Sequence, residues 1–286
     1  MSPQQEAHQH ADVLDEGLAR LAVTGPEFRG GLSNHGPMAA EAMIRLGRPE
    51  AVEPWLDGYL PLLEEPPRAS DRITDQTWPE AMGVPRRVTD WELYLRDQLA
   101  DEPWQLVLAR WWQRLVPGLA AHATHGIIRT SHAARSLAEV QTSERLHELG
   151  RGLAYWASGY LELPGGTGSG GLTLDAAISQ PIPFVHAVTA PVAARSVLGL
   201  LPGGVAQPSY DALWRTAAAL YSAYAADSAP EPPLSEPPWP ADLISRAVGT
   251  GDEHAIKFTE ACLRLYSESA DPILLQAAER ACRLLG

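Results

Sequence analysis

Three histidines and one arginine share a stripe of the segment Ala121–His132. A helix turns by about 100° per residue, so His132 lies about 20° from His125 and His122 lies about 60° to the other side. Arg129 falls among them at about 40°. The rest of the segment is Ala, Ile, Gly and small hydroxylic residues. A solvent-facing stripe normally carries Lys and Glu, and a core-facing stripe carries Leu and Val. We therefore interpret this stripe as one wall of a site.

Further histidines stand at expected helix starts or on apolar faces. Pro37 favours the first turn of a helix, which places His35 at its entrance. There His35 can either cap the backbone amides or reach a pocket. His186 holds a similar place near the start of a later helix. His254 is directed inward, because apolar residues share its face within about 40°. They are Phe258, Ala261 and Leu265.

Lys257 lies about 60° from the face of His254, which leaves two interpretations. Four residues separate Glu253 from Lys257, and this is the spacing of a surface ion pair on a helix. The alternative is a lysine that reaches into the same pocket as His254. Helical spacing alone favours the ion pair.

Imidazoles that converge from separate elements point to a metal site. Neutral histidine is the commonest protein ligand of zinc, iron and copper. The sequence has neither a cysteine-rich zinc pattern nor a His-Glu-x-x-His motif. We expect no two-histidine, one-carboxylate site, because no acidic residue stands beside these histidines on the inner faces. An all-imidazole iron or copper site with one unusual ligand fits better.

Other catalytic signatures are missing from the sequence. There is no G-x-S-x-G elbow and no cysteine–histidine signature of a nucleophile. No G-x-G-x-x-G follows a strand, so we expect no embedded flavin or nicotinamide domain. The chemistry must therefore come from the histidines themselves or from a metal that they hold.

Composition excludes several classes of partner. The formal charge of -13 argues against binding to nucleic acid or to an anionic membrane surface. No run of 18 apolar residues predicts a spanning helix, and the first residues lack the pattern of a signal peptide. Cys262 and Cys282 are expected to be free buried thiols. These features predict a cytoplasmic protein, whose oligomeric state they leave open.

Hydrophobic periodicity predicts an all-α protein, with residues 1–286 in one compact domain and long loops rich in proline and glycine. No β-type alternation extends over five residues or more. Residues 64–88 are expected to form a long surface excursion, whose use as a lid is open, and 164–171 a loop. The expected helices are 5–23, one after Pro37, 50–61, 89–100, 104–116, 118–140, 143–161, one from about 186 to 201, 208–227, 252–268 and 272–285.

Four motifs occur in order between about residues 30 and 270: Asn34-His35-Gly-Pro-Met-Ala39, His125-Gly-Ile-Ile-Arg129, His186-Ala-Val-Thr189 and His254-Ala-Ile-Lys257. Together they resemble the questin oxidase-like family of anthraquinone-cleaving oxygenases, with the spacing of a short bacterial member. Bacterial relatives carry the pattern H-G-I-I-R-T-x-H-A-x-R, which this chain has at 125–135.

The resemblance implies an all-helical oxidoreductase with a non-haem metal centre, iron(II) before other transition metals. Lys257 matches the family's lysine and, once carboxylated by CO₂, would add an anionic oxygen ligand. Arg129 and His132 would be catalytic, orienting the oxygens of a planar anthraquinone-like or polyketide-like substrate that reacts with O₂. The implied metal ligands are His35, His125, His186, His254 and Lys257.

Three alternatives remain beside the iron oxygenase. The same substrate class could be oxidised without a cofactor, with a histidine as the base, or by a Baeyer–Villiger-type monooxygenase. A non-enzymatic protein could instead use the histidines to line a pocket for an aromatic metabolite. Nine Trp and eight Tyr suit a pocket for a flat ligand, although such rings more often fill contacts between helices.

Overall fold

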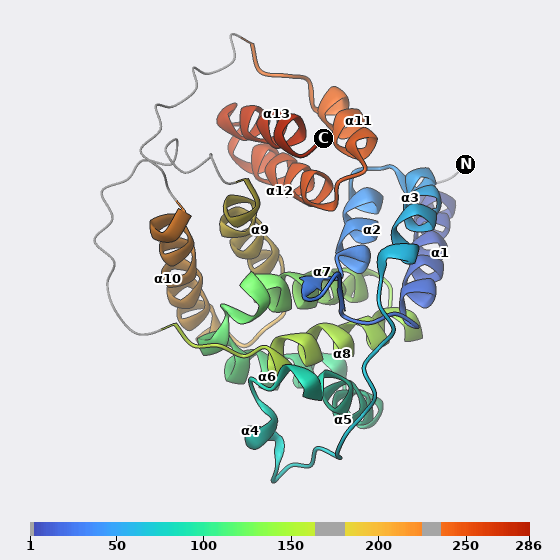
Figure 1. Ribbon diagram of the computed structural model, residues 1–286. Coiled ribbons are helices and arrows are strands. Elements are labelled where there is room, and N and C mark those ends of the chain that lie inside the picture. Colours follow the sequence, from blue (N-terminus) through green and yellow to red (C-terminus); the bar gives the residue numbers. More distant parts are fainter. Residues whose placement is uncertain (1–2, 164–180, 225–235) are drawn as a thin grey trace.

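The computed structural model describes residues 3–163, 181–224 and 236–286, and within these ranges the protein is all-α (Figure 1). This confirms the predicted fold class. A two-stranded hairpin, β1 (Glu27–Phe28) and β2 (Leu32–Ser33), is the one sheet in the described ranges. The α-helices are α1 (Pro3–Leu21), α2 (Gly36–Arg45), α3 (Val52–Tyr59), α4 (Trp78–Ala81), α5 (Val88–Asp101), α6 (Trp104–Leu115), α7 (His125–Glu139), α8 (Ser143–Ser158), α9 (Pro181–Leu198), α10 (Ala206–Tyr224), α11 (Pro240–Thr250), α12 (Glu253–Ser269) and α13 (Ile273–Leu285). Short 3₁₀ turns are η1 (Pro49–Ala51), η2 (Leu60–Leu62), η3 (Pro85–Arg87), η4 (Val116–Gly118), η5 (Ala121–Thr124) and η7 (Gly203–Val205).

Helix α7 occupies the middle of the molecule, and other helices surround it (Figure 1). Every residue of α7 from His125 to Leu137 is buried. The helix packs most extensively on α8. A Cβ atom at Gly126 would lie 2.7 Å from the backbone of Trp156, so only glycine allows the two helices to approach this closely. The glycine in the His125-Gly126 motif therefore has a packing role.

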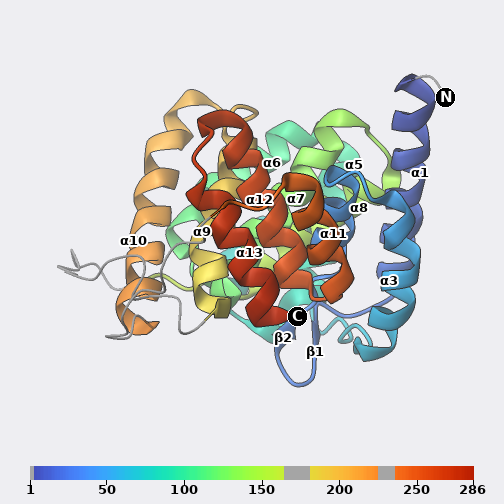
Figure 2. The ribbon, with the colours of Figure 1, turned by 90° about the horizontal axis from the view of Figure 1, so that it is seen from above.

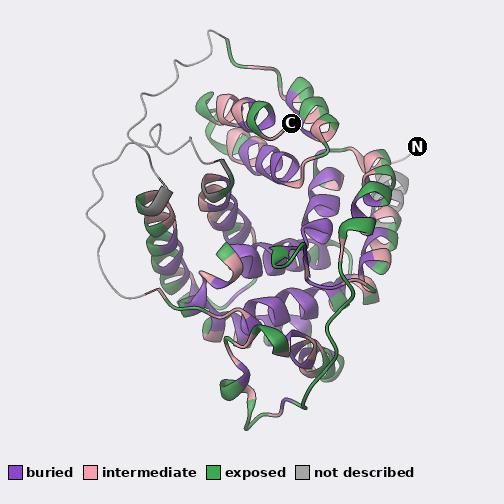
Figure 3. Cartoon of the chain, in the orientation of Figure 1, coloured by how far each residue is buried: buried purple, intermediate pink, exposed green. Residues whose placement is uncertain are grey.

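Helix α12 packs on α2 and α9, and these two helices pack on α7, on the side of α7 away from α5 and α6 (Figure 1). Their inward faces are buried (Figure 3). Seen from above, α11, α12 and α13 lie over α7, while α1 with α3 and α10 form opposite edges (Figure 2). Side chains from α2, α7, α9 and α12 can thus meet in the interior.

The long excursion after α3 is fastened to α5. Asp90 accepts hydrogen bonds from the backbone amides of Ser70 and Asp71 and pairs with Arg87. The hydroxyl of Thr89 donates to the carbonyl of Pro67. Because α5 packs on the face of α8 opposite α2 and α12, this excursion lies away from the expected site.

Two helical expectations were wrong. Residues 118–124 do not continue α7, because η5 has a left-handed backbone. Helix α11 was missed, since no helix was expected between residues 227 and 252. Pro240 in its first turn and Gly251 at its end, with a φ of 71°, are the signals that mark it.

The aromatic residues that the structure describes mainly fill helix contacts. The Trp91 ring meets the Trp111 ring edge to face at 5.1 Å, and Trp112 meets Trp156 at 5.3 Å. All four side chains are fully buried. Cys262 and Cys282 are free and buried, as expected. In the part of the chain that the structure describes, no helix combines the length and hydrophobicity needed to cross a membrane.

Candidate metal centre

Four imidazoles from four helices converge in the interior, and we call them the histidine centre. One ring nitrogen from each lies within 4.8 Å of the corresponding nitrogens of the other three. Each residue is at most 6% exposed. The residues are His35 at the N-cap of α2, His125 at the start of α7, His186 in α9 and His254 in the first turn of α12. The structure thus brings together all four histidines of the sequence motifs.

The four rings face one another. The Nε2 atoms of His35 and His125 are 2.6 Å apart. The centroid of the His254 ring is 4.5 Å from that of His35, and the centroid of His186 is 4.3 Å from that of His125. His35 makes no capping hydrogen bond, so the capping interpretation is wrong.

Hydrogen bonds constrain the tautomers of the facing pair. Nδ1 of His125 donates to the carbonyl of His122 at 2.6 Å. The Nε2 of His125 therefore carries a lone pair and can only accept a hydrogen bond. Without a metal, the short contact therefore requires His35 to donate from Nε2. With a metal between them, both Nε2 atoms would be ligands, and the proton of His35 would move to Nδ1.

The carbonyl that orients His125 belongs to a strained turn. His122, Ala123 and Thr124 have φ values of 47°, 51° and 73°, although none of them is glycine. A left-handed conformation costs such residues roughly 1–2 kcal/mol each. A helical wheel cannot describe this segment, which is why the prediction of one continuous stripe failed at His122. Persistent strain of this kind occurs where the surrounding structure imposes it, often at functional sites.

All four imidazoles of the histidine centre are held neutral. Burial lowers the pKa of each ring, and the charge of Lys257 and the neighbouring histidines lower it further. The pKa of His254 falls to about 2. The positive ends of helix dipoles at α2, α7 and α12 also oppose protonation. Neutral imidazole is the form that ligates metals.

Lys257 is buried beside the histidine centre and is 1% exposed. Its Nζ has no hydrogen-bond partner. Burial lowers its pKa to about 8, which makes part of the amine neutral near physiological pH. The surface ion pair with Glu253 is therefore wrong, and the inward orientation is correct.

Glu253 is a neighbour of the centre that sequence reasoning missed. Its Oε1 lies 3.2 Å from Nδ1 of His35 and 3.8 Å from Nδ1 of His254. Burial raises the pKa of Glu253. The expectation that no carboxylate stands beside these histidines is therefore wrong. The wheel considered Glu253 only as a partner of Lys257, and nothing in the sequence showed that α2 would bring His35 against it.

Arg129 and His132 bind other partners. The guanidinium of Arg129 donates to both carboxylate oxygens of Glu148, at 2.6 and 2.8 Å. Nδ1 of His132 lies 2.8 Å from Oε2 of Glu41, about 10 Å along α7 from His125. Arg129 and His132 line a cavity of about 10 Å³, which holds no more than one water molecule. A catalytic role for Arg129 and His132 stays a prediction. Their contacts with Glu148 and Glu41 do not favour it.

The donor set of the histidine centre fits a transition metal. His186 Nε2, His254 Nδ1 and Lys257 Nζ are buried without hydrogen-bond partners, which is uncommon for polar atoms in native proteins. Nitrogens bound to one metal at about 2.0–2.1 Å lie roughly 3–4 Å apart, so small ring movements would complete such a site.

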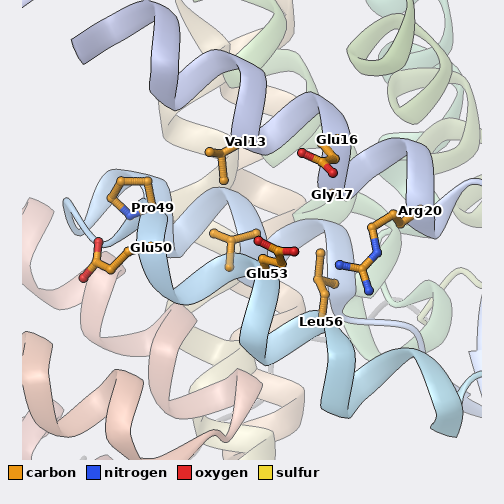
Figure 4. A pocket seen from close by; sticks show the side chains of 9 residues that line it. Val13, Glu16, Gly17, Arg20, Pro49, Glu50, Glu53 and Leu56 are labelled. Carbon is orange, nitrogen blue, oxygen red and sulfur yellow. The ribbon is translucent and has the colours of Figure 1, made fainter.

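The pocket between α1 and α3 is a separate surface feature, lined by Glu16, Glu50, Glu53 and Arg20 (Figure 4).

Comparisons of the chain with protein-family models, curated proteins and solved structures found no match. The features that bear on function are therefore the geometry of the histidine centre and the motifs in the sequence.

Proposed function

We propose that this protein is a non-haem metal oxygenase of the questin oxidase-like type, acting on a planar phenolic or quinone substrate. Iron(II) is the expected metal, held by His35, His125, His186 and His254. The observation that carries the proposal is the convergence of four buried, neutral imidazoles on one point. Bound iron(II) would activate O₂ for reaction with the substrate, and the substrate would supply the electrons that reduce O₂.

Lys257 is proposed to complete the ligand set as a carbamate. Its neutral amine nitrogen bonds to the carbon of CO₂ and loses one proton, which gives an anionic carbamate. Four neutral imidazoles leave the charge of a divalent cation uncompensated, and the carbamate would offset part of it. Partial neutrality of the amine follows from its lowered pKa. Its closeness to the histidines follows from its charge, which lowers the pKa of His35, His186 and His254.

The remaining roles belong to side chains around the histidine centre. The buried faces of α7 and α12 exclude water, which strengthens electrostatic interactions inside the site. Glu253 stands where it can accept the Nδ1 proton of His35 once both Nε2 atoms bind metal. This arrangement matches the carboxylate–histidine pairs that orient ligands in metal sites.

Metal analysis with matched histidine variants tests the proposal. Protein prepared without oxygen and reconstituted with iron(II) should retain about one iron per chain, as a preformed buried site requires. His254→Ala should lose the iron, and His132→Ala should keep it. The reconstituted protein should consume O₂ in the presence of hydroxyanthraquinones, whereas His254→Ala should not.

Two results would count against the proposal in different ways. Retention below about a tenth of an equivalent of any transition metal would overturn the metal centre and leave cofactor-free oxygenation or simple binding. If iron binds but ¹³CO₂ gives no carbamate signal, and Lys257→Ala keeps both metal and activity, the carbamate is wrong and the histidine ligands stand.

A further inference from the structure

The turn η5 (Ala121–Thr124) has two properties that the proposed function does not use. Its three left-handed residues come directly before a ligand histidine, and its carbonyl groups face ligand rings. The His122 carbonyl accepts the Nδ1 proton of His125 at 2.6 Å. The backbone of Ala123 faces the imidazole of His186 and opposes the lowering of its pKa, as a carbonyl acceptor does, and α9 packs directly on the turn. One strained turn thus contacts two of the four rings.

Both contacts have the same chemical consequence. A carbonyl can only accept, so the ring nitrogen that meets it must carry the proton. The His186 Nε2 has no partner, which leaves Nδ1 for the backbone contact. In His125 the proton therefore resides on Nδ1. We infer the same for His186, so that both rings present an Nε2 lone pair to the centre.

Side chains from α8 and its end support the turn from behind. The ring of His122 stacks on Tyr155, with centroids 3.8 Å apart and planes inclined by 6°. On its other side, a Cβ atom at Gly159 would lie 2.1 Å from the His122 ring. Tyr155 is itself fixed by a 2.8 Å hydrogen bond between its hydroxyl and Ser33. The ring of His122 is thus held in place between α8 and Gly159.

We propose that η5 is the positioning element of the histidine centre: its left-handed backbone presents two carbonyls that hold His125 and His186 as Nδ1–H tautomers. The effect of η5 on metal affinity rests on the proposed metal site, whereas the tautomers exist without metal. His122 is a positioning residue, which acts through its backbone and its packing rather than by contact with substrate. Orienting contacts of this kind typically change metal affinity by about 10–100-fold.

Ala123 offers a matched pair of variants, because its side chain is exposed and buries nothing. Glycine adopts a φ of 51° without strain, whereas proline is fixed near -65° and cannot. Ala123→Gly should bind Co²⁺ within about threefold of wild type, and Ala123→Pro should bind it about 10–100-fold more weakly. Chelator competition followed by cobalt absorption gives the affinity. Gly159→Ala, which displaces the His122 ring, should weaken binding in the same direction, and Gly199→Ala, with open space around its Cβ, should not.

A metal-free readout separates this inference from the proposed function. Long-range ¹H–¹⁵N NMR of the histidine rings should show His125 and His186 as Nδ1–H tautomers in wild type and Ala123→Gly, and as a mixture in Ala123→Pro or Gly159→Ala. If wild type binds no metal but shows these tautomers, the proposed function fails and the positioning role stands. An Nε2–H tautomer at His125 in wild type would overturn the inference. The inference would also be overturned if folded Ala123→Pro had the tautomers and the cobalt affinity of wild type. If Ala123→Pro does not fold, the same result in Gly159→Ala would overturn it.

Discussion

Helices α2, α7 and α12 carry two buried polar clusters with opposite properties. The histidine centre gathers neutral rings with unpartnered nitrogens. Two turns further along the same helices lies the second cluster, which we call the glutamate network. It consists of Glu41, His132, Arg135 and Glu260, joined by hydrogen bonds and ion pairs.

The contrast between the two clusters supports the histidine centre as the proposed site of chemistry. In the glutamate network, Arg135 donates to Glu41 at 2.9 Å and to Glu260 at 3.0 Å, so the buried charges compensate one another. Burial would raise the pKa of Glu41, but Arg135 and His132 hold it well below its usual range. Satisfied buried charges fix helices in register, whereas unpartnered lone pairs that converge on one point lack an electrophile. A metal cation would supply it.

The largest expected effect is on stability, in the glutamate network. Glu41→Ala leaves Arg135 buried with fewer partners and should lower the free energy of unfolding by about 3–5 kcal/mol. Chemical denaturation of the metal-free protein measures it. Glu41→Gln, which keeps a hydrogen-bond acceptor, should lose less. An Ala variant as stable as wild type would show that the network does not hold the helices together.

Loss of a ligand should act on the other cluster. His254→Ala should weaken metal binding by about 100-fold or more, since even outer partners of ligands contribute 10–100-fold. His132→Ala should bind metal as wild type does, once folded. Cobalt titration of both variants makes the comparison, and equal losses would erase the distinction between the two clusters.

Acid should distinguish the clusters through the histidines. Because the folded pKa of His254 lies far below 6.5, the unfolded chain binds more protons below that pH, and stability falls as pH decreases. One such ring contributes a slope of up to about 1.4 kcal/mol per pH unit. Unfolding of metal-free wild type between pH 6.5 and 5 should therefore be steeper than that of His254→Ala. The contribution of Glu41 is present above about pH 4.5 and is lost only below it, because its pKa is lowered. Parallel pH profiles would contradict the neutral, buried state of His254.

The smallest effect concerns the cost of an unpartnered amine. Lys257→Met replaces a buried polar group by an apolar side chain of similar length and should stabilise the metal-free protein by about 1 kcal/mol. The same variant should bind metal more weakly. A loss of stability without metal would mean that Lys257 has a structural partner after all.

Helical periodicity was sufficient for the parts of the site that lie within regular helices. The apolar neighbours of His254 at four, seven and eleven residues correctly placed its ring inside, and the all-α class followed from the same periodicity. The predictions failed where tertiary structure determines the backbone conformation or the partner of a side chain. The left-handed residues His122–Thr124 include no glycine, so the sequence gives no sign of this conformation. The meeting of Glu253 with His35 joins helices more than two hundred residues apart.

The spacing of residues along the helix could not predict that Lys257 is buried either. Its distance from Glu253 in sequence is that of a surface pair, and only the packing of α12 on α2 and α9 makes the position internal. A lysine 60° from an apolar face becomes buried when other helices cover both sides of that face. The family motif indicated the inward orientation, whereas the wheel did not.

The four imidazoles of the histidine centre are proposed to bind one metal ion. X-ray absorption of anaerobically iron-reconstituted protein measures this directly, because bound imidazoles give a distinct scattering pattern. We predict one iron per chain with a shell that contains the four imidazoles at about 2.0–2.2 Å, lost in His254→Ala and unchanged in His132→Ala. Iron that does not stay with the protein, or a shell without imidazole scattering, would show that the four imidazoles do not bind iron.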